Sequence, residues 1–196
     1  MNAKRELTAN DILDTDAYIK VRQERRAEIL SKKKLRRVAV GPYATFYFES
    51  YDTMWYQVQE MLRIENGGEA QLSDELCAYN PLVPKGQELV ATVMFEIDNP
   101  GIRAAVLSSL GGVEEHMTIE LGDEKILAKP EQDLDRTNSD GKASSVQFVH
   151  FEFTAEQILK FRDPRTQIRV GIDHPKYGHI AKLSEQTRDE LALDFI

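Results

Sequence analysis

The sequence predicts an α+β protein, in which N-terminal helices pack on a mostly antiparallel sheet of about five or six strands and a helix follows at the C-terminus. Segments with helical periodicity are grouped before residue 80, whereas short alternating segments separated by turns dominate after residue 88. No repeat or linker interrupts this order, and 196 residues suit one domain. We therefore expect residues 1–196 to form a single domain, with residues 1–37 as a peripheral basic helical arm.

The first expected helix, residues 16–35, carries most of the basic arm. From Lys20 to Arg37 the chain has nine Lys and Arg against two Glu, a local charge of +7, which leaves −15 for the remainder of a chain with net charge −8. One interpretation is a contact with nucleic acid or another anionic partner. The other is a solvated helix whose cations pair with acids of the same chain or of a second subunit in a homo-oligomer. The second is favoured, because an acidic chain repels phosphate backbones and no nucleic-acid-binding motif is present.

The next expected elements are an aromatic strand over 44–48 and two helices. The first of these helices, capped by Ser50 or Asp52, has one apolar face formed by Met54, Trp55, Val58, Met61 and Leu62. The second, over 73–79, holds Cys77, which we expect to be a small buried apolar residue. A nucleophilic role would need a nearby base, and no histidine lies near Cys77 in sequence. A single cysteine excludes an internal disulfide and fits a reducing compartment. We expect a cytoplasmic protein, since no apolar run approaches the length of a membrane span.

The elements after residue 88 are expected to be short. Alternating apolar residues predict strands over 89–97, 117–121, 125–128, 146–153 and 168–172. Capping or turn residues predict helices that begin after Pro100, Thr154 and Ser184. Residues 130–142 read as an acidic loop whose Asp133 to Thr137 run starts like a calcium-binding loop. Asn138 and Ser144 stand where that motif needs glycine and a bidentate glutamate, so the match fails.

Side chains that could carry chemistry concentrate on two expected strands. His150 and Glu152 lie two residues apart on one strand, so both side chains leave the same face. Asp173, His174 and His179 follow the last expected strand. If the two strands are neighbours, imidazoles and carboxylates converge, and this ligand set suits iron, manganese or zinc. The sequence thus predicts a metal site at these five residues, on condition that the strands are adjacent.

Two other interpretations of Asp173 to Tyr177 stay open. In the favoured one the segment is a structural turn, in which Asp173 bonds to the backbone, proline fixes φ, and His174 and Tyr177 cover the end of the sheet. In the other, Asp173 and His174 exchange a proton near neutral pH without a metal. No nucleophile pairs with them in sequence, and the chain has no phosphate-binding loop or glycine-rich dinucleotide motif. Whether the protein is an enzyme is left open.

Three groups of residues resemble a bacterial domain-of-unknown-function family: Thr45-Phe46-Tyr47-Phe48-Glu49 with Thr53 and residues 57–62, then residues 78–84, then Asp173-His174-Pro175-Lys176-Tyr177. The resemblance spans nearly the whole chain and implies genes beside rubrerythrin and an iron–sulfur oxidoreductase. It therefore implies a cytoplasmic accessory or interaction protein in peroxide or redox handling, with one of those two proteins as its partner. No activity comes with the resemblance, so it assigns no catalytic residue. The alternative function is a His/carboxylate metalloprotein, catalytic or not.

Overall fold

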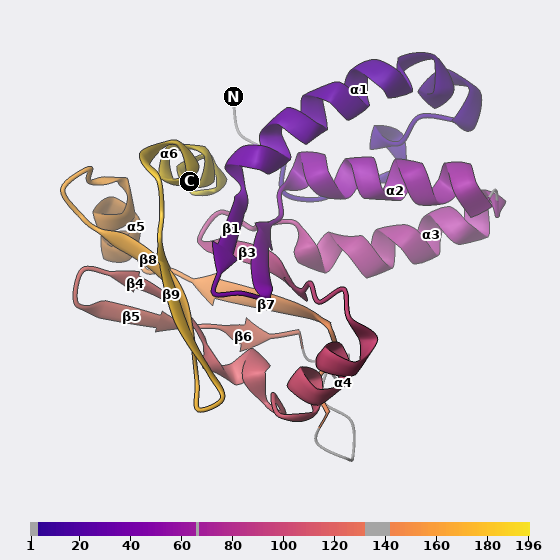
Figure 1. Ribbon diagram of the computed structural model, residues 1–196. Coiled ribbons are helices and arrows are strands. Elements are labelled where there is room, and N and C mark those ends of the chain that lie inside the picture. The colour runs from indigo at the N-terminus through magenta and orange to yellow at the C-terminus, as the bar shows by residue number, and fades with distance from the viewer. Residues whose placement is uncertain (1–3, 66, 132–141) are drawn as a thin grey trace.

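The computed structural model describes residues 4–65, 67–131 and 142–196 and confirms the α+β class (Figure 1). Its described strands form a five-stranded sheet of order β1-β2-β3-β7-β6 and a four-stranded sheet of order β5-β4-β8-β9, and the neighbouring strands in both sheets pair antiparallel. The first sheet contains β1 (Arg37–Val40), β2 (Ala44–Phe48), β3 (Glu88–Phe95), β6 (Lys129–Pro130) and β7 (Val146–Glu152). The second contains β4 (Met117–Leu121), β5 (Glu124–Leu127), β8 (Ile168–His174) and β9 (Tyr177–Lys182). The strands thus divide between two sheets, where we expected a single one.

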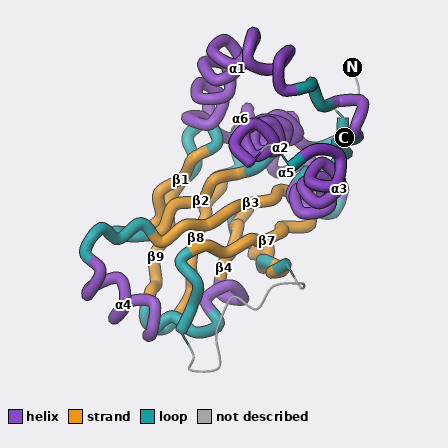
Figure 2. The backbone as a smooth tube through the Cα atoms, turned by 90° about the vertical axis from the view of Figure 1, so that its right-hand side faces the viewer, coloured by secondary structure: helices purple, strands orange, loops and turns teal. Residues whose placement is uncertain are grey.

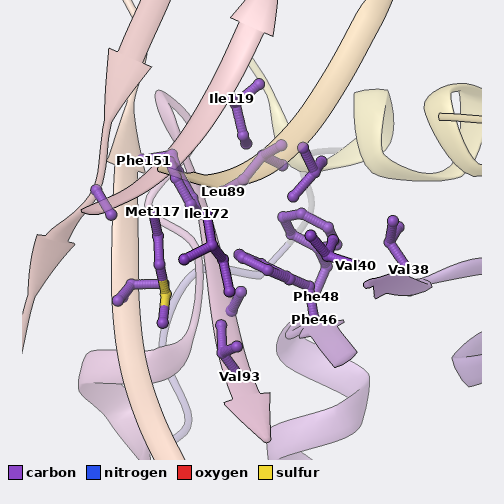
Figure 3. Packing of buried hydrophobic residues seen from close by; sticks show 14 of the residues in the cluster. Val38, Val40, Phe46, Phe48, Leu89, Val93, Met117, Ile119, Phe151 and Ile172 are labelled. Atoms are coloured by element: carbon purple, nitrogen blue, oxygen red, sulfur yellow. The ribbon is translucent and has the colours of Figure 1, made fainter. Parts of the chain in front are cut away.

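The two sheets share one apolar core because alternate residues of each strand face the other sheet. In the first sheet Phe46, Phe48 and Phe151 point to this core, and in the second Met117, Ile119 and Ile172 meet them (Figure 3). These side chains are almost fully buried. The opposite face of the first sheet is covered by helices, so β2 is buried on both faces. This explains why residues 44–48 show no clear polar side in the sequence.

Helices α2 (Tyr51–Glu65) and α3 (Gly68–Tyr79) cover that opposite face of the first sheet, and α1 (Thr15–Leu35) packs on α2 (Figures 1 and 2). Met54 and Val58 of α2 pack with Val90 of β3 in a second, smaller apolar cluster. Helix α1 lies outside α2 and buries two of its residues, Tyr18 and Ile29. The basic segment is therefore carried at the periphery of the molecule.

The remaining helices are α4 (Pro100–Ser108), α5 (Ala155–Arg162) and α6 (Glu185–Leu191). Asn99 caps α4, and the predicted capping box of Thr154 and Gln157 is present at α5. At the ends of α5 and α6 the rings of Phe153, Phe161 and Phe195 contact one another edge to face. Within the described ranges, no helix combines the length and apolar composition of a membrane span.

Three local predictions differ from the structure. Cys77 is exposed, not buried, because α3 turns Gln71 and Glu75 towards the protein and leaves Cys77 on its outer side. Helix α3 begins at Gly68, five residues before the expected start. The segment 172–179 is not the exit of a last strand: His174 pairs with Tyr177 across a tight turn, and β9 continues the sheet. The calcium-like run, Asp133 to Thr137, lies outside the described residues.

Candidate functional site

The two strands that carry the predicted metal ligands are not neighbours. Strand β7, with His150 and Glu152, lies between β3 and β6 in the first sheet, whereas β8, with Asp173 and His174, lies between β4 and β9 in the second. His179 belongs to β9. Among the residues that the structure describes, no group of three or more His, Cys, Asp or Glu side chains is arranged to hold a metal ion. Metal binding by these residues remains a prediction to which the geometry adds no support.

His150 lies between two carboxylates that sequence reasoning missed. Its Nδ1 is 3.0 Å from Glu88 and its Nε2 is 3.0 Å from Glu131. Burial works to lower the pKa of His150, but the two carboxylates outweigh burial and raise it. Burial likewise opposes ionisation of Glu88, yet the His150 contact leaves the pKa of Glu88 lowered. This arrangement is an ion-paired cluster that joins β3, β7 and the end of β6. Glu152 pairs instead with Lys129.

The residues around the β8–β9 turn are held by structural contacts. Asp173 forms an ion pair with Lys125 at 2.9 Å, and His174 accepts a hydrogen bond from the Lys176 amide at 3.2 Å. Burial lowers the pKa of His174. The ring of His116, another residue that sequence reasoning missed, meets the His174 ring edge to face at 5.1 Å. These contacts favour the structural-turn interpretation over proton exchange between Asp173 and His174. The bond to the backbone two residues on is formed by His174, whereas we expected it from Asp173.

Tyr177 and His179 fasten the second sheet to the first. The Tyr177 hydroxyl donates to the carbonyl of Val40 at 2.7 Å and accepts from the amides of Tyr43 and Ala44 at 2.9 Å, so it satisfies the turn between β1 and β2. His179 packs on the Tyr177 ring at 4.5 Å. The second half of the predicted site is therefore a joint between the sheets.

Four of the nine cations between Lys20 and Arg37 pair with acids outside this segment. Arg22 bonds Glu60 at 2.7 Å, Arg37 lies 3.5 Å from Glu96, and Lys32 pairs with Asp52. Arg36, the last residue before β1, is buried and pairs with Asp194 and with Glu190. These contacts favour the solvated-helix interpretation over a nucleic-acid contact.

A cavity of about 380 Å³ lies on the helix-covered face of the first sheet. Strands β2, β3 and β7 form its floor, and the end of α1, the start of α2 and the turn after α3 form its roof. Most of its wall is aromatic or apolar, including Tyr47, Tyr79, Leu82, Met94, Val146 and Phe148. Its volume falls in the range of roughly 300–1,000 Å³ that is usual for small-molecule sites.

Glu49 places a buried carboxylate at the wall of this cavity. It follows β2, is 8% exposed, and accepts hydrogen bonds from Thr92 at 2.7 Å and Thr53 at 2.6 Å, one on each carboxylate oxygen. Thr53 and Thr92 also line the cavity. Glu49 forms no ion pair with any residue in the described part of the chain. Buried charges in proteins are normally paired, so a carboxylate that only hydroxyl groups satisfy is unusual.

Arg36 lines the same cavity but is engaged elsewhere. Its guanidinium donates to the backbone carbonyls of Phe48 at 3.0 Å and Glu49 at 2.8 Å, and to the carboxylates of Asp194 and Glu190. Burial raises the pKa of Asp194 to about 6, and Arg36 opposes this rise. The charge of Arg36 is thus balanced by acids of the C-terminal segment and not by the carboxylate of Glu49.

A second cavity of about 390 Å³ lies between α1, α2 and the N-terminal segment, and its charged groups are already paired. The pairs Lys4 with Asp11, Arg25 with Glu28, and Lys32 with Asp52 all line it. A ligand there would have to displace ion pairs. The cavity on the sheet, which we call the sheet cavity, is therefore the better candidate site.

A family model described as a protein of unknown function, DUF3501, matches residues 6–195. The chain belongs to the DUF3501 family. A crystal structure of a novel protein of unknown function from Burkholderia pseudomallei K96243 has the same fold, with 35% sequence identity and a TM-score of 0.89. The match covers 97% of this chain and 99% of that one. A search of curated proteins found no match. The predicted resemblance to a domain-of-unknown-function family is confirmed.

The sheet cavity gathers residues from two of the segments on which that resemblance rested. Tyr47, Glu49 and Thr53 come from the first segment, and Tyr79 and Leu82 come from the second. The third segment, Asp173 to Tyr177, lies in the second sheet. Sequence reasoning did not single out Glu49 as a site residue. The available signal was a carboxylate directly after an aromatic strand and before a helix.

Proposed function

We propose that this DUF3501 protein is an accessory protein that binds a small molecule in the sheet cavity. The observation that carries the proposal is a cavity of ligand size whose aromatic and apolar wall holds one buried carboxylate, Glu49. Small-molecule sites combine an apolar lining with a few polar groups that fix orientation, and the sheet cavity has this composition. The polar groups come from rigid elements, since Thr92 lies within β3 and Thr53 in the first turn of α2.

A fragment screen tests this proposal. Compounds from a diverse library are added to the full chain and binding is followed by ligand-observed NMR. Met94→Trp fills the cavity from β3, and Ile180→Trp, at an exposed position of β9, adds the same bulk on the surface as a control. We expect hits that bind wild type and Ile180→Trp alike and that are lost with Met94→Trp. A screen without hits, or hits that Met94→Trp still binds, would overturn the proposal.

We further propose that this accessory role belongs to peroxide or redox handling in the cytoplasm, in complex with rubrerythrin or an iron–sulfur oxidoreductase. The family resemblance supports the partner, and the exposed free thiol of Cys77 fits a reducing compartment. The outer side of α1 offers a surface for such a complex, because Ile19 and Leu30 are 55% and 50% exposed among cations.

Light scattering on purified mixtures tests the partner. We expect a complex of the chain with rubrerythrin or with the oxidoreductase, which weakens when Ile19 and Leu30 are both replaced by Ser. Serine substitution of Ile102, which is 48% exposed on α4, is the matched control. Clean separation of the components at micromolar concentration would count against the partner, and self-association of the chain alone would assign the surface to a homo-oligomer.

A further inference from the structure

We propose that the sheet cavity binds an organic cation, whose ammonium group pairs with the carboxylate of Glu49 while its apolar part rests against the aromatic wall. This inference rests on the proposed function and names its ligand class. A primary or secondary amine that carries one ring or a short chain matches both the charge of Glu49 and the volume of about 380 Å³.

The first step of the argument is the hydrogen bonding of Glu49. A carboxylate offers about four acceptor positions, and the two threonine hydroxyls occupy one on each oxygen. Further donors can therefore bind the same group. Charge-assisted N–H donors form the strongest such bonds, and burial strengthens the attraction between opposite charges because the local dielectric is low.

The second step concerns the cations at the cavity. Arg36 donates a hydrogen bond to the backbone carbonyl of Glu49, and its guanidinium forms ion pairs with Asp194 and Glu190. The ammonium of Lys33 lies over the Tyr56 ring, 6.0 Å from its centroid. Neither forms an ion pair with the carboxylate of Glu49. The negative charge of Glu49 thus lacks a counter-ion from the described residues, and a bound cation supplies one.

The third step concerns the wall. Tyr47, Tyr79 and Phe148 present aromatic side chains to the cavity. Aromatic faces attract cations through their quadrupole, and more strongly where water is excluded. An aromatic wall with one carboxylate favours an amine, whereas a carboxylate or phosphate ligand would be repelled by Glu49.

A purely structural role for Glu49 gives a different expectation. Glu49 lies just before α2, and the N-terminal end of a helix dipole favours a negative charge. If that is its whole role, replacing Glu49 changes stability but leaves ligand affinity alone. The two roles therefore separate in a binding experiment.

The test is isothermal titration of the full chain at pH 7.5 with 2-phenylethylamine, neutral 2-phenylethanol and anionic 3-phenylpropanoate. We expect the amine to bind wild type at least about tenfold more tightly than the alcohol, and the propanoate to bind least. Glu49→Gln should lower amine affinity by about tenfold or more and change alcohol affinity little. Glu96→Gln is the matched control, since Glu96 also accepts from two hydroxyls, of Thr45 and Tyr47, but is exposed.

The outcomes separate this inference from the proposed function. Suppose that the alcohol or the propanoate binds as tightly as the amine and that Met94→Trp abolishes the binding of these probes. The cavity then binds ligands, but the organic-cation inference is overturned. Amine binding that Glu49→Gln leaves unchanged overturns it as well. If none of the three probes binds, the inference fails, while hits in the fragment screen would keep the proposed function. Should Glu49→Gln fail to fold, the preference of wild type for amine over alcohol decides the question.

Discussion

Glu49 and Asp194 are two carboxylates of nearly equal burial, 8% and 7% exposed, in opposite electrostatic situations. Asp194 has an arginine partner, Arg36, which also ties the backbone after β2 to the C-terminal segment. Glu49 has two threonine hydroxyls and no arginine or lysine among the described residues. The comparison shows that burial alone does not single out the carboxylate that we propose to bind a ligand. What distinguishes Glu49 is a missing counter-ion on the side where a cavity opens.

Loss of Arg36 should produce the largest effect on this comparison. Arg36→Met leaves the buried Asp194 and the half-buried Glu190 without this cation and removes two hydrogen bonds to backbone carbonyls. We expect the free energy of unfolding to fall by about 3–5 kcal/mol at pH 8, which urea denaturation measures. Lys34→Met, on the exposed side of α1, is the control and should change it by less than about 0.5 kcal/mol. A loss below 1 kcal/mol for Arg36→Met would show that Asp194 needs no partner.

The Arg36→Met penalty should also depend on pH. The pKa of Asp194 is raised to about 6 in the folded protein, above its ordinary value of 3.8. Its contribution to the free energy of unfolding is therefore fully present below pH 3.8 and is lost as pH rises through 6. Removing the cation that opposes this rise moves the loss to higher pH. The penalty measured at pH 6 is therefore expected to be smaller than at pH 8. A penalty that is flat between these values would contradict the assignment.

Glu88 and Glu131, which both pair with His150, are carboxylates in a third kind of environment. Replacing His150 should change the free energy of unfolding by an intermediate amount. His150→Gln replaces a cation between Glu88 and Glu131, and we expect a cost of about 1.5–3 kcal/mol at pH 6. The folded-state pKa of His150 is raised, so its stabilisation is fully present below the unfolded value near 6.5 and is lost as pH rises through the folded value. The difference between wild type and His150→Gln should shrink towards pH 9. A difference that grows with pH would reverse the sign we assign.

Glu49→Gln should have the smallest effect on stability. The amide keeps an acceptor for a threonine hydroxyl and removes a buried charge without a counter-ion. We expect the free energy of unfolding to change by less than about 1 kcal/mol in either direction, with an unchanged denaturant slope. A loss of stability as large as that caused by Arg36→Met would mean that Glu49 is a structural residue like Asp194. The proposed difference between the two carboxylates would then be wrong.

Much of the fold follows from sequence patterns, and the misses have physical causes. Helix α2 and strands β2, β3 and β7 have strong periodicity or caps, and the structure places them close to the predicted bounds. Strand β1 was missed because it has four residues and starts two residues after the basic helix ends. Strand β9 was missed because it lies at the edge of its sheet and only Tyr177 in it is buried, so its apolar signal is weak. Without β9, residues 172–179 looked like an exit from the sheet.

The candidate site was harder to predict because it depends on pairing between distant segments. His150 was recognised, but its partner Glu88 is set by the register of β3 and β7, which no local pattern fixes. Glu49 and Thr92 meet for the same reason, through β2 and β3. Histidines can be singled out from the sequence by their chemistry alone, whereas the cavity forms only when α2 packs on the sheet.

The most direct test of the central claim is a crystal structure of the protein with 4-bromobenzylamine, whose bromine is located by anomalous scattering. We predict bromine among the aromatic side chains of the sheet cavity and the ammonium nitrogen within hydrogen-bonding distance, about 3 Å, of the Glu49 carboxylate. Bromine in the cavity between α1 and α2, or an ammonium group directed away from Glu49, would contradict the claim that this buried carboxylate awaits a cationic ligand.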